Sequence, residues 1–390
     1  MPWRHSSAED ERWRFLQEAL RTRRGGFAAL CRHFGVSRKS GYKWLRRLKR
    51  LGRAGVSDLS RHPHRRPGCF ASSWHQAVLD VQRANYEVGA RKVRALLRAM
   101  HPRKHLPAER TIHRWLRKAG KVRRRAPSGP TLRQPSGGSS PRPNAVWTID
   151  FKGWFYTQDG RRVQLLTVRD LASRYVLAAV HVPHVDEPNV ARVLRRLFRR
   201  YGLPQSIRVD RGAPFCGDGP RRWSRLSVEW LRCGIAVQIT RRARPQDNGS
   251  HEQMHRMLKA NVATPPARTL RSQQWQVERW RRWYNERRPH ESLGQRPPAT
   301  VYRRTRAWHG RLISWRYPAP WPSRRVDRRG YICWRGLRRQ IGRAFYRQAI
   351  GLRPRGLLWE VYLGPHLLGT LHRDEHLIRP VRLSSLPQFR

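Results

Sequence analysis

Apolar and polar residues follow a helical spacing through the N-terminal part of the chain. Apolar positions recur every three or four residues at Trp13, Leu16 and Leu20, which predicts a helix over residues 9–21. The same spacing continues beyond this helix. We therefore expect the chain to begin with an all-α domain, placed at residues 1–60.

Two short helices separated by a tight turn are expected over residues 27–48. Gly35 accepts positive φ and so permits the turn, and Ser37 is placed to cap the second helix. The predicted inward residues are Ala29, Leu30, Phe34, Tyr42, Leu45 and Leu48. The outward residues of the second helix that would dock into a DNA major groove are Arg38, Lys39 and Lys43. The pattern predicts a helix-turn-helix, although an ordinary helical hairpin with a solvated charged face has the same spacing.

Residues 73–122 form a second unit with helical spacing. Helices are predicted at 74–84, 89–97 and 106–120. This unit resembles a winged-type helix-turn-helix, on weaker signals than the first. From residue 123 to residue 144 the composition changes to Pro, Gly and Ser after a basic run, which predicts a flexible linker with a basic root.

Strand-like runs replace the helical spacing after this linker. Strands are predicted at 145–151, 162–169, 175–181, 206–210 and 236–239. Helices are predicted between and after them at 188–201, 222–233, from 247 onward and at 273–284. Three consecutive strands followed by alternating strands and helices are the order of an α/β RNase H-like domain, placed at residues 145–305. Residues 306–390 carry short strands between glycines, which predicts a small β-barrel.

The net charge of the chain indicates what kind of partner it binds. The chain has 84 Lys and Arg against 25 Asp and Glu, a formal net charge of +59. Such a chain repels itself unless a polyanion neutralises it, so we expect double-stranded DNA as the partner. A ribosomal or packaging protein would share this charge, but 17 Trp residues favour folded modules over such a protein.

The five cysteines are scattered, and none of their spacings is that of a zinc site. Because they suggest no disulfide framework, a reducing cytoplasm is expected, with association to the nucleoid. The charged start of the chain is unlike a signal peptide, and no apolar run approaches membrane-spanning length. No membrane partner is expected.

Three carboxylates have unusual settings in a chain so poor in acid. Asp150 and Asp210 each end an apolar run that reads as a strand, and Glu252 lies on a predicted helix. Because oxygen ligands suit hard cations, we interpret the three as a divalent-metal site acting on DNA. Taken alone, Glu252 could equally be a surface acid paired with Arg256 at the i+4 spacing. The competing acids are interpreted as turn or cap residues: Asp170, Asp186, Asp218 and Asp247.

Groups that attract phosphate accompany these acids. At 3.6 residues per turn, one helix face would carry Asn248, Glu252, Arg256 and Lys259. Lys152 follows two residues after Asp150. We therefore predict that Asn248, Arg256, Lys259 and Lys152 contact DNA beside the carboxylates.

Four segments carry a resemblance to a known family, at residues 146–153, 209–215, 246–256 and 283–294. In this order they resemble integrase-like DDE transposases of bacterial insertion sequences, which are related to retroviral integrases. The resemblance implies that Asp150, Asp210 and Glu252 are the catalytic, metal-binding triad, holding two Mg²⁺ or Mn²⁺ ions. It further implies a metal-dependent polynucleotidyl transferase that works as a homo-oligomer on the element's ends and target DNA.

One residue departs from the family pattern. Arg211 follows Asp210, where the family usually carries Asn. An arginine there could contact phosphate, or it could mark a decayed copy. The alternative function is therefore a transposase-derived DNA-binding protein without catalytic activity. A nuclease on the same fold, which would cleave without joining, is a further alternative.

Overall fold

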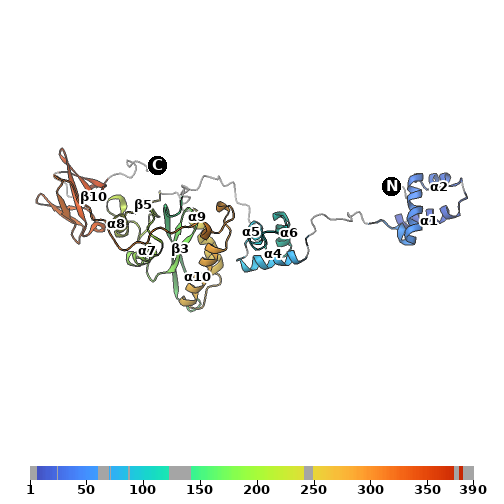
Figure 1. Cartoon of the computed structure of the whole chain (residues 1–390), viewed down its shortest axis with the longest axis horizontal. Helices are drawn as coiled ribbons and strands as arrows, with labels where there is room; N and C mark the ends of the chain where they lie inside the picture. Colours follow the sequence, from blue (N-terminus) through green and yellow to red (C-terminus); the bar gives the residue numbers. More distant parts are fainter. Residues whose placement is uncertain are drawn as a thin grey trace. The chain divides into compact units, whose positions relative to one another are not determined.

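The structure is a computed structural model. It describes residues 7–23, 25–59, 70, 72–86, 88–122, 142–240, 249–372 and 377–380. The chain forms two compact units, Met1–Cys69 and Phe70–Arg390, and each is described by itself (Figure 1). Across the described parts, none of the helices combines the length and apolar composition that a membrane span requires.

The N-terminal unit is a helix-turn-helix, as predicted. It contains α1 (Ala8–Arg21), α2 (Phe27–His33), α3 (Arg38–Leu51) and the short 3-10 helix η1 (Gly52–Val56). Gly35 has a φ of 63°, and the Ser37 side chain caps α3 by accepting a hydrogen bond from the Ser40 amide at 3.1 Å. Both turn signals therefore act locally, as the sequence predicts.

The buried stripes of this unit differ from the predicted ones. Leu20 is 62% exposed and Tyr42 is 54% exposed, whereas Phe15 is fully buried. Ala29 is exposed as well. Gly41 is where α3 packs closely against α2, because a Cβ atom at this position would stand 2.9 Å from Cys31 Sγ. The adjacent Tyr42 does not make this contact. The inward face of α3 is therefore shifted by one position from the expected one.

The second helical unit is α4 (Ser72–Ala84), α5 (Ala90–Met100) and α6 (Glu109–Lys118), close to the predicted spans. Its apolar core is continuous with that of the central domain, through Val93 and Ile112 on one side and Val163 and Trp283 on the other. These helices therefore belong to the larger compact unit.

A five-stranded mixed sheet forms the central domain, in the order β3-β2-β1-β4-β5. The strands are β1 (Val146–Tyr156), β2 (Arg162–Asp170), β3 (Val176–His181), β4 (Ser206–Val209) and β5 (Ala236–Ile239). The first three are antiparallel to one another, and β4 lies parallel to β1 and to β5. Three strands followed by alternating strands and helices along the chain are the predicted order of an RNase H-like core. Strand β1 runs on past its predicted end to Tyr156, so Asp150 lies within the strand and not at its end.

Helices cover both faces of this sheet. Helices α7 (Glu187–Tyr201) and α8 (Arg225–Arg232) share a core with Trp147, Ile149 and Leu166. Helices α9 (Gly249–Val262) and α10 (Leu270–Glu286) share the opposite core with Val163 and Leu165. The short helices η2 (Pro220–Arg222), η4 (Glu291–Leu293) and α11 (Pro298–Val301) lie in the connections.

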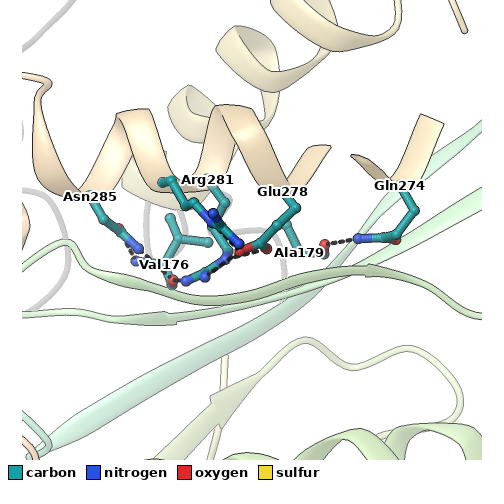
Figure 2. Close-up of polar contacts among 7 residues, drawn as sticks. Val176, Ala179, Gln274, Glu278, Arg281 and Asn285 are labelled. Carbon is teal, nitrogen blue, oxygen red and sulfur yellow. Dashed lines mark hydrogen bonds and ion pairs between the residues drawn. The ribbon is translucent and has the colours of Figure 1, made fainter. Parts of the chain in front are cut away.

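Side chains of α10 cover the free edge of β3 (Figure 2). Asn285 accepts from the Val176 amide at 2.8 Å and donates to the Val176 carbonyl at 2.9 Å. Gln274 donates to the Ala179 carbonyl and accepts from the His181 amide. Two amide side chains thus replace a neighbouring strand, so the edge is closed to further pairing.

The C-terminal region is an antiparallel sheet in the order β12-β11-β10-β9-β6, with a separate β7-β8 hairpin. Its elements are β6 (Ser323–Arg325), β7 (Tyr331–Trp334), β8 (Leu337–Gln340), η5 (Arg343–Phe345), β9 (Ala349–Arg355), β10 (Leu358–Leu363), β11 (His366–His372) and β12 (Arg379–Pro380). The predicted barrel is wrong, because the described strands form no closed sheet. The sheet instead buries its apolar side chains in one cluster with Trp223, Val228 and Leu231 of the central domain.

Candidate active site

Asp150 lies on the central strand β1, where Trp147 and Ile149 anchor one face of the strand in the core. Its carboxyl is 22% exposed. Burial is the main cause that raises its pKa from 3.8 to about 7; the negative charges of Asp210 and Glu252 contribute to the rise, and the Phe151 amide and Lys152 oppose it. The three predicted acids therefore interact at Asp150.

Strand register places Asp210 beside Asp150. Thr148 of β1 pairs with Arg208 of the parallel strand β4, and each aspartate follows two positions later. Adjacent strands lie about 4.8 Å apart, so both carboxylates emerge at the same edge of the sheet. The Asp210 carboxylate accepts a hydrogen bond from the Gly212 amide at 3.2 Å, which orients it locally.

Glu252 lies in the first turn of α9 and is exposed, together with Arg256 and Lys259 on the same helix. These three residues therefore lie on an exposed, charged face of α9, as predicted. Lys259 and Lys152 are close enough that Lys259 lowers the pKa of Lys152, second to the effect of burial. Asn248, also predicted on this face, lies outside the described residues.

An adjoining face of α9 carries two buried histidines, His251 and His255. The Thr167 hydroxyl lies 2.9 Å from the Asp150 carbonyl oxygen and 2.7 Å from Nε2 of each histidine. Because the carbonyl can only accept, the Thr167 hydroxyl donates to it. His251 also contacts the Thr148 hydroxyl through Nδ1, at 2.9 Å. This hub fastens the helix of Glu252 to the strand of Asp150.

Both histidines of the hub are neutral. Burial lowers the pKa of His255 to about 3, and burial together with the neighbouring His255 and Arg169 lowers the pKa of His251 well below its ordinary value. His255 Nδ1 stands 3.7 Å from Asp150 Oδ2. Because a neutral imidazole forms no ion pair, His255 packs beside this carboxyl without balancing its charge.

Arg211 does not share the space of the carboxylates as a free cation. Its Nε donates to the Thr240 carbonyl at the end of β5, at 2.9 Å. The Thr240 amide in turn donates to the Val209 carbonyl at 3.0 Å. Arg211 therefore joins the segment after Asp210 to Thr240 at the end of β5. The Asn that the family carries at this position has a side chain too short for such a bond.

The remaining predicted residues are acids that accept backbone hydrogen bonds and basic residues exposed on α3. Asp170 and Asp186 act as caps, accepting from the Ser173 and Asn189 amides. Arg38, Lys39 and Lys43 are exposed on α3, as predicted. Thr167, His251 and His255 were not predicted. A His pair at i and i+4 beside Glu252 was the available signal, but spacing alone does not say which helix face is buried.

Among the residues that the structure describes, no group of three or more His, Cys, Asp or Glu side chains is arranged to hold a metal ion. Asp150, Asp210 and Glu252 thus influence one another electrostatically without forming a closed set of ligands. Carboxylate oxygens are nevertheless the donors that Mg²⁺ and Mn²⁺ prefer.

Comparison with known families identifies the parts of the chain. Residues 140–245, which contain Asp150 and Asp210, match the integrase core domain, and residues 233–298, which contain Glu252, match a second model of that description. Residues 322–378 match the C-terminal domain of IS481 family transposases, and residues 11–68 match a helix-turn-helix domain.

Similar proteins come from bacterial insertion elements. The chain is 28% identical over 199 residues to an uncharacterized 31.7 kDa protein of IS407 from Burkholderia multivorans (strain ATCC 17616 / 249), covering 50% of this chain and 69% of that protein. It is 29% identical over 260 residues to an uncharacterized 39.2 kDa protein of IS476 from Xanthomonas euvesicatoria, covering 65% and 71%.

Solved structures that resemble this chain include retroviral integrases. The catalytic core domain of BIV integrase aligns at 20% identity and a TM-score of 0.32, over 41% of this chain and 93% of that chain. The matches to family models and to insertion-element proteins confirm the predicted resemblance: parts of this chain match the integrase core domain and the C-terminal domain of IS481 family transposases.

Proposed function

We propose that this protein is a transposase that binds the ends of an insertion element, cleaves the 3′ strands and joins them to target DNA. The observation that carries the proposal is the alignment of Asp150 and Asp210 on adjacent parallel strands, with the charge of Glu252 raising the pKa of Asp150. A site of this kind collects negative charge that only a cation can balance.

The donor set fits divalent metal ions. Asp150, Asp210 and Glu252 would hold them, since all three offer carboxylate oxygens and their mutual repulsion disappears when a cation is present. Two bound Mg²⁺ or Mn²⁺ ions would supply the charge that activates a water or 3′-hydroxyl and stabilises the leaving oxygen.

The chain's own residues bind and orient the DNA. Arg256 and Lys259 are exposed on α9 beside Glu252, and Lys152 is near Lys259, so phosphates that approach the carboxylates meet positive charge. The Thr167 hub fastens helix α9, which carries Glu252, to strand β1, which carries Asp150. Such rigid positioning supplies much of the rate enhancement expected for phosphoryl transfer.

End recognition would belong to the N-terminal unit, where the basic residues of α3 are exposed. Because the two ends of an element must be brought together, we expect a homo-oligomer assembled on DNA. The basic linker at 123–144 falls largely outside the described residues.

The test is strand transfer with Mg²⁺ on a labelled oligonucleotide taken from the inverted repeats that flank the gene. Asp150→Asn, Asp210→Asn and Glu252→Gln should each abolish joining while leaving DNA binding unchanged. Asp218→Asn is the matched control, an exposed acid of the loop that follows Asp210, and should retain activity. Full activity in any one of the three variants would remove that residue from the site.

The same assay separates the alternatives. A DNA-binding protein without activity would bind the repeats and never cut them, whereas a nuclease would yield hydrolysis products without joined ones. The Arg211 side chain donates through Nε to the Thr240 carbonyl. Cleavage and joining by the unsubstituted protein would show that Arg211 leaves the site active.

A further inference from the structure

The strand that carries Asp150 changes face just beyond it. The register of β1 against β2 shifts by one residue between Phe151 and Trp154, and Gly153 within this bulge has a φ of 83°. Phe151 pairs with Leu166, and Trp154 pairs with Gln164. Leu166 and Gln164 are two positions apart, so Phe151 and Trp154 lie on the same face of the sheet.

This face is not the one that α9 covers. Asp150 pairs with Thr167, whose hydroxyl contacts the histidines of α9. Leu166 instead belongs to the core under α7. The bulge therefore moves Trp154 and Tyr156 to the α7 side of the sheet, whereas regular pleating would have placed both on the α9 side.

Beyond the reach of α7, these aromatic side chains stay open to solvent. Trp154 is 58% exposed and Tyr156 is 51% exposed. Their rings meet edge to face at 5.3 Å, and the Arg162 guanidinium lies 5.1 Å from the Trp154 ring. We call these three residues the hairpin patch.

The support of the hairpin patch is rigid. At the turn between β1 and β2, the Gln158 amide donates to the Ala267 carbonyl at 3.0 Å and the Asp159 amide donates to the Arg268 carbonyl at 3.1 Å. The hairpin is thus fastened to the segment between α9 and α10. A surface held in this way loses little conformational entropy on binding.

We propose that the hairpin patch binds unpaired nucleobases of the DNA on which this protein acts, an inference that rests on the proposed function. Single exposed apolar residues are common, but two adjoining aromatic rings with an arginine over one of them are the composition of a base-stacking platform. Exposed Arg161 and Arg268 add positive charge, against one acid in the turn, Asp159.

Unpaired bases fit this surface better than a duplex does. In a duplex the flat faces of the bases are covered by their neighbours, and the accessible groups are phosphates and groove edges. Those groups bind cations and hydrogen-bond donors, not an indole ring. Cleavage near an element's end creates strands whose terminal bases can leave the stack, and their free faces match Trp154 and Tyr156.

The experiment measures binding of the full chain by fluorescence anisotropy in EDTA, so that no cleavage occurs. Two probes are compared, a blunt duplex and the same duplex with an unpaired extension of about eight nucleotides. Trp154→Ala should weaken binding of the extended probe by roughly fivefold to a hundredfold, the range of one base–aromatic stack. Binding of the blunt probe should not change, and Trp154→Phe should retain most of the affinity.

Trp275→Ala is the matched control. Trp275 is 62% exposed on α10 and also lies under an arginine, Arg279, at 5.5 Å. It should not distinguish the two probes. An equal loss on both probes in Trp154→Ala would overturn the proposal, and so would an unchanged affinity for both.

A change of molar mass in light scattering, from a larger to a smaller species in Trp154→Ala, would make the patch a contact between copies of the chain and overturn the proposal. Failure of the proposed function is seen separately, as absence of Mg²⁺-dependent joining by the unsubstituted protein. The anisotropy assay does not depend on that reaction.

Discussion

Burial and neighbouring acids together change the ionisation of Asp150. Its carboxyl is mostly buried, and two other acids act on it. Folding therefore favours the protonated form up to about pH 7, whereas the unfolded chain loses this proton near pH 3.8. The stabilising contribution is complete below the lower value and is lost as the pH rises through the higher one.

The first prediction concerns this pH range. Without divalent metal, the free energy of unfolding should fall between about pH 4 and pH 7, by up to about 4 kcal/mol at 1.4 kcal/mol per pKa unit. Mg²⁺ should raise the unfolding temperature at about pH 8 more than at about pH 5, because it balances the ionised carboxylates. Differential scanning calorimetry measures both effects.

Asp150→Asn is the companion variant. It removes the buried charge, so in EDTA at about pH 8 it should unfold at a higher temperature than the unsubstituted protein, with a smaller response to Mg²⁺. A variant that is less stable under these conditions would contradict the electrostatic account of Asp150.

At the scale of elements, the hydrogen bonds between α10 and β3 cannot be predicted from the local sequence of either element. A helical period predicts α10, and an apolar run predicts β3, but neither predicts that two amides of the helix would complete the strand's hydrogen bonds (Figure 2). The arrangement matters because an open edge strand pairs readily with other chains.

The second prediction tests this edge. Asn285→Ala leaves the buried Val176 amide without its partner, and each such group costs about 1–3 kcal/mol. Chemical denaturation should therefore show a loss of that size, with increased aggregation on partial unfolding. Gln274→Ala should have a smaller effect in the same direction, because Gln274 is half-buried.

Gln276→Ala serves as the control on the same helix, since the described contacts assign this residue no hydrogen bond. Its stability should change by less than about 0.5 kcal/mol. Equal losses in Gln276→Ala and Asn285→Ala would attribute the effect to helix propensity and not to the strand edge.

At the scale of the whole molecule, the helix-turn-helix unit and the larger unit are separately compact. Their tasks should therefore be separable by substitution. The third prediction uses Arg38, Lys39 and Lys43, which are exposed on α3.

Replacing these three residues by Ala should weaken binding to the terminal repeats and lower the slope of log affinity against log salt by about one per lost phosphate contact. Mg²⁺-dependent stabilisation of the larger unit should remain. Arg21→Ala, at the exposed end of α1, is the control for loss of charge alone. An unchanged salt slope in the triple variant would place end recognition elsewhere in the chain.

In the C-terminal sheet, packing against the central domain decides a fold that the strand pattern alone predicts wrongly. Short strands between glycines suit a barrel, yet β6 and β12 at the two edges of the sheet have only three and two residues. Such short edges cannot close on each other. The apolar face is covered instead by Trp223 and its neighbours from the central domain.

The sequence by itself determined the features that depend on a few neighbouring residues. The turn at Gly35, the cap at Ser37 and the strand that ends just before Asp210 follow from positive φ, side-chain capping and an apolar run, whereas the strand of Asp150 runs on to Tyr156. Assignment of Asp150, Asp210 and Glu252 as the catalytic triad remains a prediction drawn from their settings and the family resemblance.

Only the tertiary structure decided what distant segments do to one another. Thr167 and His251 are 84 positions apart in the chain, and Val176 and Asn285 are 109 apart. The one-residue bulge after Phe151, which turns an aromatic pair to the other face, also depends on pairing with β2. Local spacing cannot encode such contacts, because burial and hydrogen bonding depend on which surfaces meet once the chain has folded.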